Sequence, residues 1–232
     1  MEKNTEELVQ NILKEGFIKL DLYDEKELNQ LTKMIKKYSL KPYEIMRNFN
    51  HPAYKAAVTP KVKQILFKIA HQKVKFLPEI TSSPSLITEE NISISFSKKG
   101  PTFGNAKINK HTFHYDNSFL NLVLPLELPP EPSKGSGLYA YINLKKKFGM
   151  GFISKVISLL LGRISILRIF FRPRFLKYKR GIASIFFGDI SLHGVGDCSD
   201  GDRRALTINL SQTPYNEFKA KYCNSHKYLN NQ

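Results

Sequence analysis

The chain has 232 residues, of which 41% are hydrophobic and 24% charged, so the composition excludes a wholly disordered protein and allows one domain with a substantial core. The two cysteines, Cys198 and Cys223, exclude a disulfide framework, and they disfavour a zinc ribbon because they form no CxxC pair. The formal net charge of +16 favours an anionic partner, such as nucleic acid, an anionic membrane surface or a phosphorylated substrate.

The first quarter of the chain predicts three helices and one strand. The periodicity of apolar residues predicts helices over 5–15, about 25–38 and about 60–73, and a half-buried strand over 17–22. Gly16 is expected to end the first helix, Asp24 to cap the second and Pro60 to open the third. We therefore expect residues 1–80 to be mainly helical.

From residue 88 the pattern changes to short apolar segments separated by Gly, Pro, Asn and Asp. The expected strands cover residues 91–96, 111–125, 138–144, 183–188 and 205–211. Several short strands with turn signals favour a sandwich or a barrel. We therefore expect an α+β arrangement in a single domain over 1–232, with a β core over 88–212. A basic, apolar block at 145–180 interrupts this core and is expected to be helical.

The segment His114-Tyr115-Asp116 places an imidazole and a carboxylate two residues apart. On an extended backbone, residues i and i+2 point to the same side, so the two groups can converge on one point. His193 follows a Gly-Asp turn and a predicted strand. Two neutral imidazoles and one carboxylate form the facial triad that suits iron(II) and leaves three coordination positions open. We therefore predict that His114, Asp116 and His193 are the catalytic metal ligands.

Arg203 follows His193 by ten residues and opens the last expected strand. A 2-oxo diacid can chelate the metal through two positions, with O2 in the third, and its distal carboxylate then needs a buried cation. An arginine presents a planar fork for that carboxylate. The strand alternates, with Leu206, Ile208 and Leu210 on the face opposite Arg203. If this apolar face packs on the helices, Arg203 points into the barrel and Arg204 does not.

The order of HxD motif, distal histidine and R-x-A-L-T resembles the iron(II)/2-oxoglutarate dioxygenases, and most of all their phytanoyl-CoA dioxygenase-like branch. The N-terminal EGFIKLDLYDEKEL is similar to that branch as well, and the resemblance covers about residues 8–212. It implies a double-stranded β-helix, the cupin-like jelly roll, with N-terminal helices packed on it and the metal at its mouth. It also implies Fe(II), 2-oxoglutarate and O2 as the cofactor and co-substrates.

The resemblance further implies hydroxylation of a C–H bond with release of succinate and CO2. Asp116 implies a hydroxylase, because halogenating relatives carry a small residue at that position. Many members of the branch place the arginine one residue further from the distal histidine, which keeps Arg204 open as the anchor of 2-oxoglutarate. The facing of the strand and the match to R-x-A favour Arg203.

The block at 145–180 contains eleven cationic residues and no acidic one. It is interpreted either as a helix buried against its own core, or as an amphipathic segment that lies on an anionic membrane or forms a lid. No stretch reaches the roughly 18 apolar residues of a membrane span, and the N-terminus has no signal-peptide core. We therefore expect a cytoplasmic protein, and the basic block allows peripheral contact with a membrane.

Three function classes remain open at this point. The favoured one is an oxygenase that acts on a small-molecule or lipid-like substrate. An oxygenase acting on nucleic acid is supported by the charge alone, and the R-x-N-x-T-x-R pattern of nucleic-acid demethylases is absent. A non-catalytic jelly-roll binding module is the third class, but such a module has no need of all three metal ligands. Substrate identity and oligomeric state stay open.

Overall fold

The computed structural model describes residues 5–38, 43–46, 49–77, 87–99, 114–116, 118–129, 137–144, 156–157, 160–161, 172–195 and 201–211. The helices are α1 (Thr5–Glu15), α2 (Glu25–Tyr38), α3 (Pro52–Ala57), α4 (Pro60–Phe76) and the 3-10 helix η1 (Glu89–Asn91). The strands are β1 (Ile18–Asp21), β2 (Tyr43–Met46), β3 (Ile92–Lys99), β4 (Ser118–Glu127), β5 (Gly137–Tyr141), β6 (Arg174–Lys177), β7 (Ile182–Phe186), β8 (Leu192–Val195) and β9 (Arg203–Ser211).

The helix ends follow the expected capping chemistry. Asp24 and Glu27 form a reciprocal cap at the start of α2, since each side chain accepts a 2.8 Å hydrogen bond from the other's backbone N–H. Thr59 caps α4 ahead of Pro60, its hydroxyl accepting from the N–H of Val62. Gly16 ends α1 at a φ of +88°, which only glycine adopts without strain. The predictions at Gly16, Asp24 and Pro60 are confirmed.

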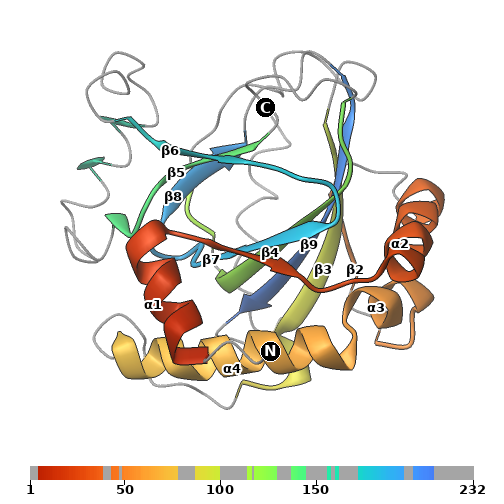
Figure 1. Cartoon of the computed structure of the whole chain (residues 1–232), viewed down its shortest axis with the longest axis horizontal. Helices are drawn as coiled ribbons and strands as arrows, with labels where there is room; N and C mark the ends of the chain where they lie inside the picture. The colour runs from red at the N-terminus through yellow and green to blue at the C-terminus, as the bar shows by residue number, and fades with distance from the viewer. Residues whose placement is uncertain are drawn as a thin grey trace, which may run out of the picture.

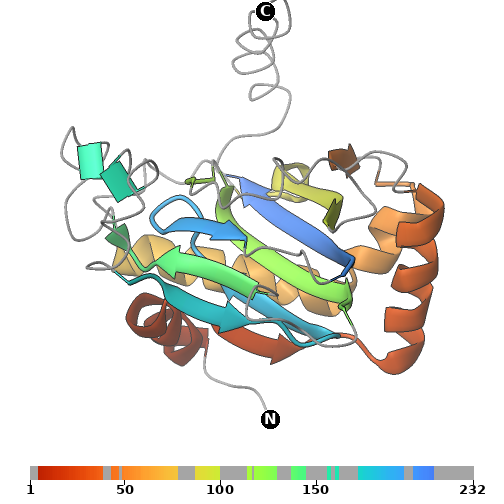
Figure 2. The ribbon, with the colours of Figure 1, turned by 90° about the horizontal axis from the view of Figure 1, so that it is seen from above.

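Two antiparallel sheets form the centre of the structure. One has six strands in the order β1-β7-β4-β9-β3-β2, and the other has three in the order β6-β5-β8. Figure 1 shows α4 along one side of the six-stranded sheet and the three-stranded sheet on the other, and Figure 2 shows the same layers from above. The predicted α+β class is confirmed by this mixture of helices and sheets.

The two faces of the six-stranded sheet differ in character. On β9, Leu206, Ile208 and Leu210 are fully buried in the main core, which the helices complete. The opposite face points toward the three-stranded sheet, and there Ala205 belongs to a second, smaller apolar cluster. That cluster consists of Val123, Leu138, Leu176, Tyr178, Phe186 and Ala205. The space between the sheets therefore carries less apolar packing than the helix-covered face.

One expected element is wrong. The block at 145–180 was expected to be helical, but residues 174–177 form strand β6, which pairs with β5. β6 is an edge strand in which only Leu176 is buried. Its mixture of basic and apolar residues therefore lacks a clear strand alternation, and the sequence does not reveal the pairing with β5. Residues 156–157 and 160–161 are helical, and the rest of 145–171 lies outside the described residues.

Besides β6, the elements without an expected counterpart are β2, α3, η1 and β8. The other predicted helices and strands are found, most with ends shifted by a few residues. The start of the strand expected over 111–125 falls at Ser118, and residues 111–113 lie outside the described part. Within the described ranges, the structure contains no helix of the length and apolar character needed to cross a membrane.

Candidate metal centre

His114 and His193 lie side by side through their main chains. The two residues form an antiparallel β-bridge, in which each N–H donates to the other's carbonyl oxygen at 2.8 and 2.9 Å. His193 belongs to β8, which in turn pairs with β5. Backbone hydrogen bonds, rather than side-chain contacts, therefore fix the separation of the two imidazoles, whose ring centroids are 4.6 Å apart.

Asp116 completes the group from the same segment as His114. Its N–H donates to the carbonyl oxygen of Gly188 at 3.0 Å, which holds the segment against the turn that precedes β8. The His114 Nε2 lies 3.3 Å from Asp116 Oδ1, and the His193 Nε2 lies 3.1 Å from Asp116 Oδ2. One ligand atom from each of the three residues lies within 4.8 Å of the other two.

These separations fit the requirements of a bound metal ion. Two ligand atoms that each lie about 2.1 Å from a metal, at right angles to one another, are about 3 Å apart. The two imidazole-to-carboxylate distances of 3.3 and 3.1 Å, which run to different oxygens of Asp116, are close to that value. Two imidazole nitrogens and one carboxylate oxygen are also a donor set that suits iron(II). The three residues could therefore hold one divalent ion.

The ring of His193 is oriented by its neighbours. Its Nδ1 lies 3.0 Å from the carbonyl oxygen of Ser191, which can accept from an Nδ1–H, and this contact directs Nε2 toward Asp116. The ring of Phe186 packs edge-on at 4.9 Å between centroids. The His193 side chain is buried, whereas the His114 side chain is 51% exposed, so the group opens to solvent on the His114 side.

The carboxylate of Asp116 is held by a second set of polar groups. The Asn121 amide donates to Asp116 Oδ2, and the Ser118 hydroxyl donates to the Asn121 carbonyl oxygen, which fixes the amide's direction. Burial by itself raises the pKa of Asp116, but hydrogen bonds from His114 and His193 and their charge outweigh burial and hold that pKa below its usual range. The Asp116 carboxyl is therefore ionised at neutral pH.

Gly188 leaves room for this arrangement. A Cβ added at Gly188 would lie 2.6 Å from the Asn121 amide nitrogen and 2.9 Å from Asp116 Oδ2. Both distances are shorter than ordinary contact, so any larger residue would displace the carboxylate or its amide partner. The glycine of the Gly-Asp turn is thus required by the close approach of Asp116, and not by an unusual backbone angle.

The next residue of the turn, Asp189, meets a buried lysine. Lys73 of α4 is fully buried, and its ammonium lies 2.6 and 2.8 Å from the two Asp189 carboxylate oxygens. The ammonium also donates to the Phe119 carbonyl oxygen at 2.9 Å and faces the rings of Phe119 and Phe187. This ion pair was not predicted from the sequence. The available signal was that Lys73 follows Leu66 and Ile69 on the buried stripe of α4.

The two arginines of β9 have different surroundings. Arg203 is 2% exposed on the face toward the three-stranded sheet, with its guanidinium carbon 5.3 Å from the centre of the Tyr178 ring. Among the described residues, its Nε and Nη1 have no hydrogen-bond partner. Arg204 instead pairs with Glu127, whose other oxygen lies 2.9 Å from the Lys36 ammonium. Arg203 therefore has buried N–H donors that lack a hydrogen-bond acceptor among the described residues.

No family model matches the chain, and no curated protein matches it either. Among solved structures, the chain resembles a Pseudomonas putida prolyl-4-hydroxylase, with a TM-score of 0.56 and 12% sequence identity, covering 92% of this chain and 97% of that one. It also resembles a prolyl 4-hydroxylase from Phytophthora capsici, with a TM-score of 0.54 and 14% identity, covering 89% of this chain and 62% of that one.

A third similar structure is SnoN, a non-haem α-ketoglutarate-dependent epimerase from nogalamycin biosynthesis, with a TM-score of 0.55 and 10% identity, covering 89% of this chain and 80% of that one. Likeness at such low identity concerns the fold alone. The chain therefore shares its fold with these two prolyl 4-hydroxylases and with SnoN. None of these three structures is described as a phytanoyl-CoA dioxygenase, so that branch remains a prediction from the sequence.

Proposed function

We propose that the chain is an iron(II)- and 2-oxoglutarate-dependent dioxygenase that hydroxylates a C–H bond of a small-molecule or lipid-like substrate. The observation that carries this proposal is the convergence of ligand atoms from His114, Asp116 and His193 within 4.8 Å of one another. An iron(II) ion held there would activate O2, with 2-oxoglutarate converted to succinate and CO2 and the substrate hydroxylated.

The order of the strands supports a double-stranded β-helix as the finer description of the fold. Along the chain, β3, β4, β7 and β9 enter the six-stranded sheet, whereas β5, β6 and β8 enter the three-stranded one. His114 lies between β3 and β4 in the sequence and bridges to His193 of β8. The chain thus passes back and forth between two facing sheets, which is the path of a jelly roll.

We assign the metal-holding role to His114, Asp116 and His193, and the anchoring of 2-oxoglutarate to Arg203. A buried guanidinium with unpartnered donors is costly unless an anion fills it, and a carboxylate accepts two parallel N–H bonds from an arginine. Arg204 is less suited to this role because Glu127 already takes its guanidinium. The buried Asn121 and Phe186 then orient the ligands rather than bind the metal.

The test is to add iron(II) and then 2-oxoglutarate to the protein without oxygen and to follow the visible absorption spectrum. A new charge-transfer band that requires both additions, and that the His193→Ala protein lacks, is the expected result. Succinate formed on admission of air should match the band in its dependence on both components. If the protein binds neither component, or gives no succinate with any substrate tried, the oxygenase proposal is wrong and the chain is better explained as a non-catalytic binding module.

The reaction on the substrate needs a separate readout. One structural neighbour is named an epimerase and two are named hydroxylases, and these outcomes differ in whether oxygen enters the product. Mass analysis of the product after reaction under ¹⁸O2 distinguishes them, because hydroxylation adds one labelled atom and epimerisation adds none. Substrates are to be ranked by how strongly each stimulates succinate formation.

A further inference from the structure

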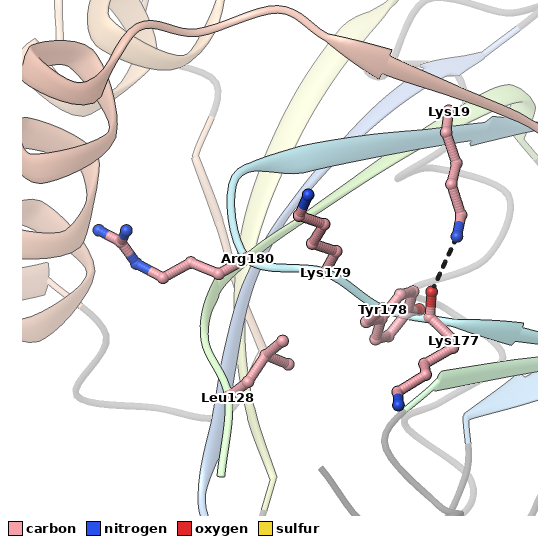
Figure 3. Close-up of a pocket in the computed structure, with 6 residues that line it drawn as sticks. All are labelled: Lys19, Leu128, Lys177, Tyr178, Lys179 and Arg180. Atoms are coloured by element: carbon pink, nitrogen blue, oxygen red, sulfur yellow. Dashed lines mark hydrogen bonds between the residues drawn. The ribbon is translucent and has the colours of Figure 1, made fainter. Parts of the chain in front are cut away.

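A concave site lies between β1 and the turn that joins β6 to β7, and none of its lining residues is a candidate metal ligand. This pocket has a volume of about 400 Å³, within the roughly 300–1,000 Å³ that small-molecule sites occupy. Six residues line it, and four of them are cationic (Figure 3). The lining consists of Lys19, Leu128, Lys177, Tyr178, Lys179 and Arg180. No acidic residue lines it.

Three of the cations remain available to a ligand. Arg180 is already engaged, with its guanidinium 3.3 Å from the Asn29 side chain and 3.7 Å from Glu25, both on α2, and Figure 3 shows it directed away from the other cations. Among the described residues, the ammonium groups of Lys177 and Lys179 have no polar partner, and both side chains are exposed.

Lys19 joins the two walls of the pocket. Its ammonium donates to the main-chain carbonyl oxygen of Lys177 at 3.2 Å, which links the edge strand of the six-stranded sheet to the edge strand of the three-stranded one (Figure 3). An ammonium has three donors, so this contact leaves two for a ligand. The Lys19 ammonium is therefore held in place beside the backbone of β6, unlike the ammonium of a lysine that extends freely into solvent.

The lining selects a class of ligand. Three ammonium groups without a carboxylate repel one another and favour a group that carries more than one negative charge and several acceptor oxygens, which is the chemistry of phosphate. The Leu128 side chain and the buried Tyr178 ring add an apolar wall, which suits an organic portion next to the charged group. A simple monocarboxylate would satisfy only part of this donor set.

We propose that this pocket binds a phosphate ester through Lys19, Lys177 and Lys179. The site is separate from the metal centre, and the proposal does not depend on the chain being an oxygenase. The pocket has one contact with the surroundings of Arg203, because the Tyr178 ring that lines the pocket also lies 5.3 Å from the guanidinium carbon of Arg203.

The experiment is calorimetric titration of the metal-free full chain with inorganic pyrophosphate at low ionic strength. Saturable one-to-one binding is expected, and the Lys177→Gln/Lys179→Gln variant should bind about tenfold or more weakly, because it loses two charge-assisted contacts. The matched control is Lys33→Gln/Lys68→Gln, which removes the same charge from exposed positions on α2 and α4. The control should retain the affinity of the parent protein within about twofold.

Three results would overturn the proposal: no binding of pyrophosphate, an equal loss in the control variant, or displacement of pyrophosphate by excess 2-oxoglutarate. The second result would mean attraction to the net charge as a whole, and the third would place the anion elsewhere, at Arg203. Vesicles of phosphatidic acid in phosphatidylcholine test whether the phosphate belongs to a lipid headgroup or to a soluble ester. Vesicle binding that pyrophosphate displaces indicates a lipid headgroup, whereas pyrophosphate binding without vesicle binding indicates a soluble ester. Either outcome supports the phosphate site.

Discussion

The Lys73 ammonium lies 2.6 and 2.8 Å from the two carboxylate oxygens of Asp189, and this contact ties helix α4 to the turn that leads into β8. The turn includes Gly188, whose carbonyl oxygen accepts from the N–H of Asp116, and four residues after Asp189 comes His193. A buried ion pair on the helix side of the sheet therefore positions two of the three candidate metal ligands on its other side.

Replacing Lys73 with Met should lower the free energy of unfolding by about 3 kcal/mol, because the Asp189 carboxylate loses its buried partner. Urea unfolding followed by circular dichroism measures this change. Lys75→Met, on the same helix at an exposed position, is the matched control and should change stability by about 0.5 kcal/mol or less. Equal stability of the two variants would show that the Lys73–Asp189 pair contributes nothing to holding the turn.

Replacing His193 with Ala should abolish iron binding and succinate formation while the protein stays folded, because the buried imidazole packs on Phe186 of the smaller apolar cluster and not on the main core. The measurements are iron per chain after gel filtration, succinate by mass spectrometry and the thermal unfolding midpoint. His71→Ala, exposed on α4, is the control and should leave all three unchanged. Normal iron content in the His193→Ala protein would contradict the assignment.

Arg203→Ala and Arg204→Ala should have different effects. Loss of a buried cation that pairs with a ligand carboxylate costs about 2–5 kcal/mol, so Arg203→Ala should raise the 2-oxoglutarate requirement by at least about thirtyfold. Arg204→Ala breaks a partly exposed pair with Glu127 and should cost about 1 kcal/mol of stability or less, with the 2-oxoglutarate requirement nearly unchanged. Succinate production as a function of 2-oxoglutarate concentration ranks the two variants, and the reverse ranking would assign the anchor to Arg204.

Gly188→Ala should weaken iron binding by about tenfold or more, because the added methyl group would lie 2.9 Å from the Asp116 oxygen that faces His193. Iron affinity from a competition titration with a chelator is the readout, and the thermal unfolding midpoint reports any general damage. A loss of stability with unchanged iron affinity would mean that the turn relaxes without moving Asp116, and would remove the steric explanation for the glycine.

The basic block at 145–180 is predicted to dock on an anionic membrane surface, and two of its described residues, Leu160 and Phe175, are exposed at 38%. Co-sedimentation with anionic liposomes should weaken sharply with salt, since each cation near the surface contributes about 1 kcal/mol and is screened. Phe175→Ser should reduce the fraction of protein that still sediments with vesicles at high salt. Phe49→Ser, which removes a similarly exposed ring elsewhere, should leave that fraction unchanged. Equal, negligible sedimentation with neutral and anionic vesicles would exclude docking.

Local rules account for the parts of the site that the sequence predicted. Two-residue spacing on an extended chain placed the His114 and Asp116 side chains together, and strand alternation placed Arg203 and Leu206 on opposite faces of β9. Both rules act within a few residues. They require no knowledge of which strands are neighbours, and for that reason they succeed from sequence alone.

The parts that were missed depend on contacts between distant segments. Lys73 and Asp189 are 116 positions apart, and neither residue type signals a buried pair until the sheet brings them together. The sequence predicts a helix where β6 lies, because the strand is stabilised by pairing with β5 and by the contact of Phe175 with Tyr139, which are distant in the sequence. Gly188 was expected only to make a turn, although the space it leaves is used by Asp116 and Asn121.

The place of β9 in the six-stranded sheet also bears on how the protein is made. β9 is the last described strand in the sequence, yet it lies between β4 and β3 and hydrogen-bonds to both. Until β9 has formed, β3 and β4 each carry an unpaired edge, and such edges invite aggregation. Chains that stop before Arg203 should therefore aggregate more readily than chains that include β9.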